Sequence, residues 1–519
     1  MAALSDRPVD SAERLRLGAA GSRGAAHRAR LGQFFTPAPV ARMVASMLAP
    51  QAAGRVRLLD PGAGVGALTA AAVERFATLG VRELEVVAWE IDAGLHPQLR
   101  DTLGRCAAWG AERGVSVLWE LREGDYVQAA AEACVGDSGG AGEFDAVVMN
   151  PPYRKVNGDA AERRALERIG LPITNLYTAF LALAAGQLAP GGALAAITPR
   201  SFANGRYSAP FRRFFFDLVG IERLHLFESR TDAFADSGVL QENVIFSVRR
   251  DTKPEAVQVS FSRGVADEPR VLEVPGEEIV RSDDPDLFLR IPSDEDDTDI
   301  AAAMTALPSS LEDLGIAVST GRVVEFRARE HLRVTPEAGT APLLRPNHFK
   351  DGGIRWPAAD RRGKPNALAA VPASAKLLLP NGTYVLVKRL TAKEERRRVR
   401  AAVCDPTVAP GPRIAFENHL NVFHRDNEGL PPDLAQGLAA FLNSTLVERY
   451  VRQFNGHTQI NATDLRHLRY PAADDLALLG RVVSREAPGA QEELDRLVDR
   501  AVRGVAIEAE GQDALEPAA

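Results

Sequence analysis

The chain has 519 residues, more than one hydrophobic core usually spans, so two or three domains are expected. Its 45% hydrophobic and 25% charged residues are typical of a soluble globular protein and argue against a membrane-embedded or disordered chain. Three scattered cysteines exclude a disulfide framework, and the histidines and cysteines show no metal-ligand spacing. Because the first residues also lack an apolar signal core, we expect a cytoplasmic protein with no metal and no membrane partner.

The net charge of −7 argues against a nucleic-acid partner only if it is spread evenly along the chain. It is not, because residues 311–420 contain 19 Lys or Arg and 11 Asp or Glu, a net charge of +8. The remainder therefore carries −15. A basic block in an acidic protein predicts a surface that faces phosphates, although a solvated charged face fits the charge equally well.

The chain begins with a segment, residues 1–30, that is rich in Ala, Arg and Ser and has no clear periodicity, which predicts a flexible N-terminus that is mobile or forms a loose helix. Residues 32–37 (Gly-Gln-Phe-Phe-Thr-Pro) then precede a helical pattern. Thr36 before Pro37 predicts a helix N-cap with proline in the first turn. The expected apolar face of that helix consists of Val40, Met43, Val44 and Met47.

From about residue 32 to residue 250, apolar strand-like runs alternate with helical patterns. This alternation predicts a Rossmann-like, doubly wound α/β domain whose last strand is antiparallel. Residues 177–198 are expected to form a buried helix, a turn and a strand, and residues 131–143 a surface loop. The six predicted strands are residues 56–59, 84–89, 116–121, 144–149, 192–198 and 239–248.

The acidic stretch 282–299 is predicted to be a linker or loop before a second domain. We therefore place a catalytic domain at 31–299, a mixed α+β domain at 300–505 and a disordered tail at 506–519. In the second domain, helical patterns occur at 391–403 and 432–453, and residues 394–400 are predicted to form a strongly basic helix.

A glycine-rich loop, residues 60–66 (Asp-Pro-Gly-Ala-Gly-Val-Gly), follows the first predicted strand. Alternating glycines allow a tight turn and a close approach to a ligand. A dinucleotide site is the alternative, but its spacing is Gly-x-Gly-x-x-Gly. Asp60 would also repel a pyrophosphate, whereas it suits a ligand with an ammonium or sulfonium group.

Two further acidic residues follow the next predicted strands. Glu90 can accept hydrogen bonds from the two hydroxyls of a ribose, and Ile91 can cover an adenine face. Asp125 can accept from an adenine amino group, with Tyr126 alongside. Acidic residues in this order at successive strand ends predict contacts to S-adenosylmethionine.

The most informative motif, Asn150-Pro151-Pro152-Tyr153, follows the strand-like run 144–149. Two prolines end the strand and fix the backbone of a loop at its carboxyl end. The loop offers an amide, free carbonyls and an aromatic ring. This combination suits holding a planar amino group while a ring stacks on the base that carries it.

In this order, the motifs resemble the gamma class of N6-adenine DNA methyltransferases of bacterial restriction–modification systems. Residues 188–192 and 197–202 are similar to later motifs of that class, and residues 454–465 resemble a segment of modification enzymes paired with six-base-cutting endonucleases. The resemblance covers residues 30–475, densely to residue 250. It implies target recognition after the catalytic domain, which fits the basic block.

The resemblance implies transfer of a methyl group from S-adenosylmethionine to the N6 amine of an adenine flipped out of double-stranded DNA. Asn150 and the Pro151 carbonyl would accept from the amine, and Tyr153 with Phe234 would stack on the base. The implied cofactor contacts are Gln33, Phe35, Thr36, Pro37, Asp60, Gly62, Gly64, Gly66, Glu90, Ile91, Asp125, Tyr126 and Asn150. The candidate DNA contacts are Arg345, Arg361, Arg362, Lys388, Arg389, Arg396, Arg397 and Arg398.

Several alternatives stay open at this point. RNA and protein-glutamine methyltransferases also carry Asn-Pro-Pro-Tyr, and the exocyclic amine of cytosine is a possible target. A catalytically silent specificity subunit is a further alternative. About 30 residues before the first motif are too few for a nuclease, so we expect a separately encoded cognate endonuclease rather than a bifunctional enzyme.

Overall fold

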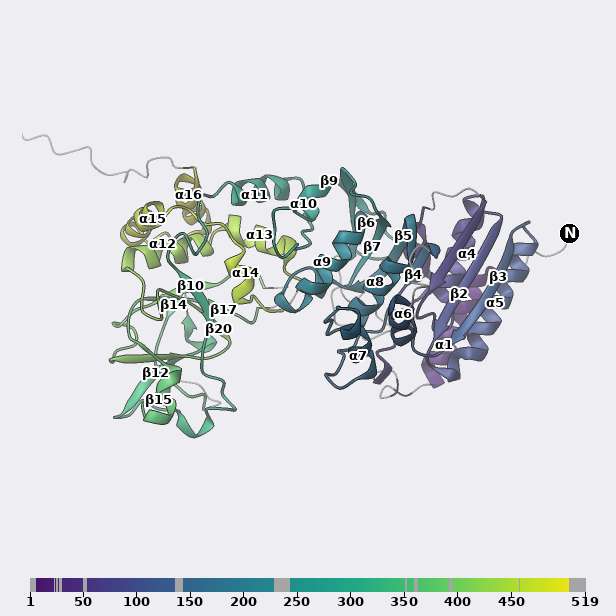
Figure 1. The fold of residues 1–519 in the computed structure, drawn as a ribbon. Coiled ribbons are helices and arrows are strands. Elements are labelled where there is room, and N and C mark those ends of the chain that lie inside the picture. The colour runs from purple at the N-terminus through teal and green to yellow at the C-terminus, as the bar shows by residue number, and fades with distance from the viewer. Residues whose placement is uncertain are drawn as a thin grey trace, which may run out of the picture. The chain divides into compact units, whose positions relative to one another are not determined.

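The computed structural model (Figure 1) describes residues 6–22, 24, 27, 30–49, 54–135, 143–227, 243–350, 352–358, 363–391, 395–456 and 458–503. The chain forms two compact units, Met1–Pro292 and Ser293–Ala519. Phe234, Arg361, Arg362 and the predicted tail lie outside the described residues. Among the residues that are described, no helix has the length and apolar character needed to cross a membrane.

The first unit is built from alternating strands and helices. Its strands are β1 (Arg55–Asp60), β2 (Glu83–Glu90), β3 (Ser116–Glu123), β4 (Phe144–Met149), β5 (Leu188–Pro199), β6 (Val219–Phe227), β7 (Asn243–Arg250), β8 (Ala256–Ser262) and β9 (Arg270–Pro275). Its helices are α1 (Pro8–Ser22), α3 (Ala38–Ser46), α4 (Ala67–Thr78), α5 (His96–Ala111), α6 (Tyr126–Val135), α7 (Ala161–Arg168), α8 (Leu176–Gln187), α9 (Ala209–Leu218) and α10 (Gly276–Ile279).

These strands form one nine-stranded sheet with the order β3-β2-β1-β4-β5-β7-β6-β8-β9. Strands β1 to β5 are parallel, and β7 is antiparallel to both of its neighbours, β5 and β6. The predicted doubly wound fold and its antiparallel strand are thereby confirmed. The strand order reverses between β1 and β4, and α/β sheets bind ligands at such a switch point.

Helices cover both faces of the sheet (Figure 1). One apolar core joins β1, β2 and β4 to α1, α3, α4 and α5 through residues such as Leu58, Val148 and Phe76. The other core joins the opposite face to α6, α8 and α9 through residues such as Val147 and Phe180. Alternate strand residues therefore serve opposite layers, as the period of two requires.

The N-terminal segment, predicted to be mobile or a loose helix, contains the packed helix α1. Val9 and Ala12 are fully buried in the core that joins α1 to α4 and α5. The buried Glu74 carboxylate accepts from the Val9 backbone N–H at 3.0 Å and from Arg7 Nε at 2.9 Å. The helix alternative is therefore the one observed, and the sequence did not show its packing because small buried residues leave no clear amphipathic pattern and tertiary contacts hold the helix.

Three strands, β6, β8 and β9, were not predicted. β6 contains Glu222, Arg223 and His225, which interrupt its apolar pattern, yet it pairs with β7 and β8. In the predicted loop 131–143, residues 131–135 belong to α6, and residues 136–142 lie outside the described set.

The second unit is mixed α+β, with sheets ordered β10-β20-β17-β18, β11-β15-β12-β19-β16 and β13-β14. Its strands are β10 (Ala317–Thr320), β11 (Leu332–Arg333), β12 (Thr340–Leu344), β13 (Phe349–Lys350), β14 (Gly353–Ile354), β15 (Ala367–Ala369), β16 (Leu378–Pro380), β17 (Tyr384–Lys388), β18 (Ala401–Cys404), β19 (Arg413–Phe416) and β20 (Leu420–His424). Its helices are α11 (Asp296–Thr305), α12 (Pro432–Leu442), α13 (Thr445–Phe454), α14 (Ala462–Arg466), α15 (Ala473–Glu486) and α16 (Gln491–Val502).

The basic helix predicted at 394–400 is wrong. Residues 395–400 form bends that lead into β18. The buried Glu448 carboxylate accepts from the backbone N–H groups of Arg398 and Val399 at 2.9–3.0 Å. These tertiary bonds replace the ones a helix would make.

Two other helical boundaries differ from the sequence pattern. The pattern at 432–453 is split into α12 and α13, because Ser444 caps α13 by accepting from Val447 N–H. Part of the acidic stretch 282–299 forms the first turn of α11, where carboxylates favour a helix N-terminus.

Helices α12 and α15 cross at a pair of glycines. A Cβ atom on Gly437 would lie 1.7 Å from the Leu476 carbonyl oxygen, and one on Gly480 would lie 1.8 Å from the Asp433 carbonyl oxygen. Any side chain at either position would therefore push the two backbones apart.

We expect Gly437→Ala to destabilise the second unit by about 3 kcal/mol or more, because the overlap is with backbone that cannot rotate away. Urea denaturation measures this change. Gly104→Ala is the matched control, since a Cβ on Gly104 in α5 has no neighbour within 4 Å and should stabilise by about 0.5–1 kcal/mol. Equal effects of the two substitutions would contradict this packing.

Candidate active site

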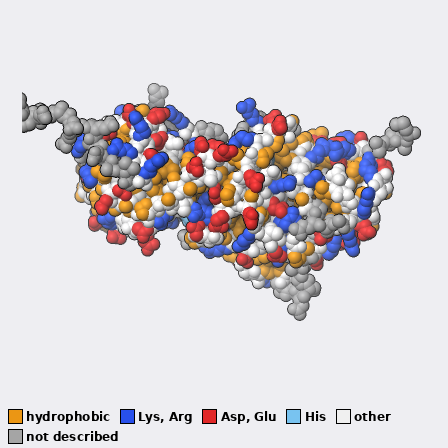
Figure 2. All heavy atoms as spheres, turned by 90° about the horizontal axis from the view of Figure 1, so that it is seen from above, with side chains coloured by type: hydrophobic (Ala, Val, Ile, Leu, Met, Phe, Trp, Pro, Cys, Tyr) orange, Lys and Arg blue, Asp and Glu red, His pale blue; other side chains and the backbone are white. Residues whose placement is uncertain are grey.

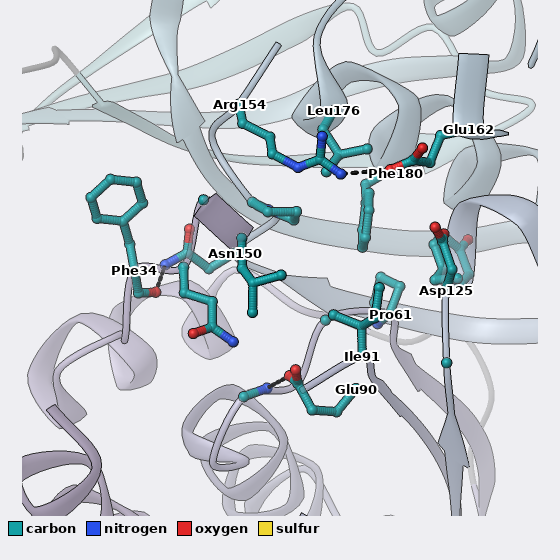
Figure 3. Close-up of a pocket in the computed structure, with 18 of the residues that line it drawn as sticks. Phe34, Pro61, Glu90, Ile91, Asp125, Asn150, Arg154, Glu162, Leu176 and Phe180 are labelled. Atoms are coloured by element: carbon teal, nitrogen blue, oxygen red, sulfur yellow. Dashed lines mark hydrogen bonds and ion pairs between the residues drawn. The ribbon is translucent and has the colours of Figure 1, made fainter. Parts of the chain in front are cut away.

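A cavity lies in the first unit at the carboxyl ends of β1, β2 and β4, beside the switch point of the sheet. Figure 3 shows its lining, which comes from segments far apart in the sequence. The lining residues are at positions 31–35, 61, 62, 64, 90, 91, 124–126, 150, 152, 154, 162, 176 and 180. The cavity thus unites all the sequence motifs predicted to bind a cofactor.

The glycine loop forms one wall of the cavity. Gly62 and Gly64 line it, and Gly64 has a φ of +58°, a left-handed conformation that favours glycine. Gly66 is not among the lining residues. It precedes α4 with a φ of +86°, and a Cβ there would lie 2.9 Å from Thr102 Cγ2, so this glycine serves helix packing.

Asp60 lies behind the loop and is not among the residues that line the cavity, although its Oδ1 has no partner among the described residues, so its contact to a ligand cation stays a prediction. Its carboxylate is completely buried and accepts from Thr69 Oγ1 at 2.7 Å. Burial raises the pKa of Asp60 to about 7, and hydrogen bonds from Thr69 and the Gly62 backbone oppose this shift. The side chain supports the shape of the glycine loop.

Glu90 ties the loop to the end of β2. Its carboxylate oxygens accept from Gly64 N–H at 2.8 Å and from Asp92 N–H at 2.7 Å. Burial raises the pKa of this carboxyl above its ordinary value, against the hydrogen bonds from those two amides. The neighbouring Ile91 is 52% exposed, an unusual state for isoleucine, and it lines the cavity.

Asp125 and Tyr126 lie at the start of α6. Asp125 Oδ1 accepts from the backbone N–H groups of Val127 and Gln128, and this caps the helix. Asp125 and Tyr126 both line the cavity. Sequence reasoning missed Phe180 of α8, whose ring lies 5.1 Å from the Tyr126 ring. Figure 3 shows Phe180 and Ile91 pointing into the cavity from opposite sides.

Residues 31–35 close the remaining side. Gln33 Nε2 donates to Asp92 Oδ2 at 3.3 Å, while Gln33 Oε1 is buried and has no partner among the described residues. Phe35 lines the cavity next to Gly64. A buried unpartnered acceptor in a cavity wall is a position where a ligand donor fits.

Asn150 has one fixed orientation. Its Nδ2 donates to the Phe34 carbonyl oxygen at 3.1 Å and to Thr36 Oγ1 at 3.0 Å, and Figure 3 shows the first of these bonds. The Phe34 carbonyl can only accept, so it must face the amide nitrogen. Asn150 Oδ1 therefore points the other way, where it is buried without a partner in the described part of the chain.

Thr36 was predicted to cap α3, and that prediction was wrong. Pro37 occupies the N-cap position, and no side chain bonds to the first turn of the helix. The Thr36 hydroxyl is instead used by Asn150, which is its structural role.

Tyr153 is held on three sides. Its hydroxyl donates to the Ile197 carbonyl at 3.2 Å, its ring lies 5.0 Å from the Phe34 ring, and Tyr177 packs edge-on at 6.4 Å. Burial raises its pKa far above the ordinary tyrosine value, so the phenol stays protonated. Phe34, which sequence reasoning left without a role, positions both Asn150 and Tyr153.

An ion pair that sequence reasoning also missed lines the cavity. Arg154 Nη2 lies 2.5 Å from Glu162 Oε1 of α7, and both side chains are largely shielded from solvent (Figure 3). The sequence shows Arg154 directly after Tyr153, but no pattern in it indicates that Glu162, eight residues later, is the partner of Arg154.

Two of the predicted DNA contacts are structural in the second unit. Arg345 is 4% exposed and pairs with Glu325 at 2.9 Å, and Arg398 is 2% exposed and donates to the Asn455 carbonyl at 2.9 Å. Their burial with protein partners corrects the prediction for these two residues.

The other described candidates keep some exposure. Lys388 Nζ lies 5.2 Å from the centre of the Phe349 ring, and burial lowers the pKa of this lysine. Burial likewise lowers the pKa of Arg397, whereas Arg396 is exposed. Arg389 is half-buried in a hydrogen-bonded position, so these four remain predictions.

Comparison with known proteins gives the family. The family model described as "Eco57I restriction-modification methylase" matches residues 117–234. Type II methyltransferase M.PstI of Providencia stuartii is 41% identical over 451 residues, 86% of this chain and 88% of that protein. The chain belongs to the type II methyltransferases of restriction–modification systems. Type II methyltransferase M.BsuBI of Bacillus subtilis is 38% identical over 462 residues, 88% of this chain and 91% of that protein.

The likeness to solved structures concerns the fold. The type IIL restriction-modification enzyme MmeI, solved in complex with DNA, matches with a TM-score of 0.54 at 12% identity. The match covers 90% of this chain and 71% of that chain. Family membership confirms the resemblance to restriction–modification methyltransferases found in the motifs.

The buried Asp60 carboxyl predicts a specific pH dependence of stability. Its pKa is raised in the folded protein, so its contribution to stability is complete below about pH 4 and is lost as the pH rises through about 7. Asp60→Asn should remove that loss. Relative to wild type, the variant should gain about 3 kcal/mol between pH 4.5 and pH 8 in urea unfolding. Asp159→Asn, at an exposed position, is the control, and parallel pH profiles for wild type and Asp60→Asn would contradict the burial argument.

Proposed function

We propose that the protein transfers a methyl group from S-adenosylmethionine to the N6 amine of adenine at a specific site in double-stranded DNA. The modification would protect that site from a separately encoded cognate endonuclease. The observation that carries this proposal is the buried, unpartnered Oδ1 of Asn150 beside the cavity.

That oxygen needs a donor. Leaving a buried acceptor without a partner costs about 1–3 kcal/mol, and a substrate amine would remove that cost. Asn150 Oδ1 and the carbonyl of the adjacent Pro151 are two acceptors next to each other, and among the described residues neither receives a hydrogen bond. An exocyclic amine has two N–H groups to give.

The cavity fits S-adenosylmethionine. Ile91 and Phe180 would hold the adenine between them, Asp125 would accept from its amino group, and Glu90 would accept from the ribose hydroxyls. Gln33 Oε1 would accept from the ammonium group. When bound, the cofactor supplies a methyl group made electrophilic by its sulfonium.

The residues of this chain would orient the amine. The adenine N6 lone pair is delocalised into the ring, so the amine is a weak nucleophile. Acceptance of both N–H groups by Asn150 and Pro151 would direct the lone pair toward the cavity and stabilise the positive charge that develops on nitrogen. The amide needs no reorganisation, since Phe34 and Thr36 hold it in place.

Tyr153 is suited to the base rather than to the cofactor, because it does not line the cavity although Asn150 and Pro152 do. Stacking of a base on an aromatic ring contributes about 1–3 kcal/mol, which offsets part of the few kcal/mol needed to flip the nucleotide. Phe234 remains a predicted second stacking residue.

Support for a DNA substrate comes from the family, since M.PstI and M.BsuBI are type II methyltransferases and both align over most of their length. The decisive experiment incubates the purified protein with S-adenosylmethionine and unmethylated bacterial DNA, followed by digestion to nucleosides. N6-methyladenine is the expected product. If the product were a methylated cytosine, adenine would be the wrong target base. If the DNA carried no methylated base, DNA would be the wrong substrate, and RNA or protein glutamine would be tested instead.

We expect Asn150→Ala to lower kcat at least about 100-fold, as loss of one preorganised transition-state contact does. The dissociation constant of S-adenosylmethionine, measured by calorimetry, should change little. Asn157→Ala, at an exposed position in the loop that follows, is the control and should keep wild-type activity. Full activity of Asn150→Ala would refute the mechanism.

A further inference from the structure

The tight turn between β19 and β20, residues 417–419, contains a buried carboxylate. The Glu417 side chain is 0% exposed. Its Oε1 lies 2.5 Å from His419 Nδ1, and its Oε2 accepts from the His419 backbone N–H at 3.1 Å. Because an unpaired buried carboxylate is very costly, this arrangement holds the imidazole in one orientation.

The His419 ring itself is 43% exposed. A carboxylate can only accept, so Nδ1 carries the proton of this bond and Nε2 faces away from Glu417. Among the described residues nothing bonds to Nε2. The turn therefore presents one hydrogen-bonding nitrogen to solvent at a fixed position, and such a preorganised group loses little entropy when it binds.

A cation lies beside this turn. Arg389 Nη1 donates to the Asn418 carbonyl at 3.2 Å, and its backbone N–H donates to the His419 carbonyl at 2.9 Å. Arg389 Nε is buried and has no partner within the described residues. The next residue, Leu390, is 47% exposed.

The charges around the turn leave a small positive excess. Glu325 is paired with Arg345 at 2.9 Å, and this hydrogen bond and the charges of Arg345, Lys364 and His419 lower its pKa. Glu417, buried under His419, lies beside Arg389, which sets one negative charge against one positive charge. Lys364 is left in excess, and this local charge suits a polyanion.

Charge density alone would not single out this surface. On the face drawn in Figure 2, Lys and Arg side chains are interspersed with Asp and Glu rather than gathered in one patch. The 417–419 turn is distinguished by the fixed orientation of its partly exposed histidine ring.

The segment 454–465, whose sequence resembles that of known modification enzymes, holds the turn in place by hydrogen bonds. Ile460 N–H donates to the Arg389 carbonyl at 2.8 Å, and Asn421 Nδ2 donates to the Ile460 carbonyl at 2.8 Å. Arg389 Nη2 also donates to Asn461 Oδ1 at 3.3 Å. The segment thus fixes both Arg389 and the start of β20.

We propose that His419 contacts a base edge in the DNA recognition sequence, and that Glu417 is the positioning residue that orients it. This inference rests on the proposed function. A fixed, outward-facing ring nitrogen matches the donor and acceptor pattern of a base edge in the major groove, and Arg389 beside it suits the adjacent phosphate.

The test uses the full-length protein and duplexes that carry the site methylated by wild type or every single-base-pair variant of it. His419→Ala should lower kcat/KM on the wild-type site by about 5- to 150-fold, through KM, and should flatten discrimination at one base pair only. Glu417→Ala should behave like His419→Ala. Glu417→Gln keeps one acceptor oxygen, enough for Nδ1 but not also for the His419 backbone N–H, and should retain more discrimination than Glu417→Ala.

His331→Ala is the control for a histidine paired with a solvent-exposed carboxylate, since the His331 side chain is 16% exposed and its partner Glu330 is 79% exposed. It should change neither rate nor discrimination, and melting temperatures should show that His419→Ala remains folded. Unchanged discrimination in His419→Ala would overturn the proposal. So would a uniform loss on all duplexes with a weaker salt dependence, which marks a phosphate contact. Absence of any DNA methylation by wild type would instead count against the proposed function.

Discussion

The site depends on one small set of hydrogen bonds between residues 32–36 and residues 150–153. The Asn150 amide nitrogen donates to the Phe34 carbonyl and the Thr36 hydroxyl, and Tyr153 N–H donates to the Gly32 carbonyl at 3.0 Å. Gly32 has a φ of +68°, and a Cβ there would lie 3.1 Å from Tyr153 N, so the approach requires glycine. Through these contacts the loop after β4 and the wall of the cavity form one rigid structure.

Rigidity matters because the proposed chemistry is a problem of orientation. The proposed transfer needs no enzyme nucleophile. It needs acceptors that face the amine before it arrives, and the methylated nitrogen then releases one of its protons to water. Fixed orientation is also found around the cavity, where the buried carboxylates of Asp60 and Glu90 accept hydrogen bonds that hold the glycine loop in shape. In the second unit, the buried Glu417 carboxylate likewise orients another side chain, His419. Buried acids in this protein mainly position other groups.

Much of the first unit could be predicted, since parallel strands buried on both faces are continuous apolar runs and the motifs follow them directly. Contacts formed in tertiary structure could not. Asp60 was predicted to line the cavity, but its side chain bonds to Thr69 behind the glycine loop. The basic helix predicted at 394–400 does not form, because the Glu448 carboxylate, 50 residues away, accepts from the Arg398 backbone N–H. Phe180 lies in a helix so uniformly apolar that no periodicity marks it as a cavity residue. The Glu417–His419 pair has no spacing signature at all.

The most direct test is a crystal structure of the protein with S-adenosylhomocysteine and a duplex carrying its recognition site. The account predicts a flipped adenine whose N6 lies about 2.7–3.1 Å from both Asn150 Oδ1 and the Pro151 carbonyl, with Phe34 and Thr36 still bonded to the amide nitrogen. An adenine amine beyond hydrogen-bond reach of Asn150, or an Asn150 amide turned away from Phe34, would contradict it.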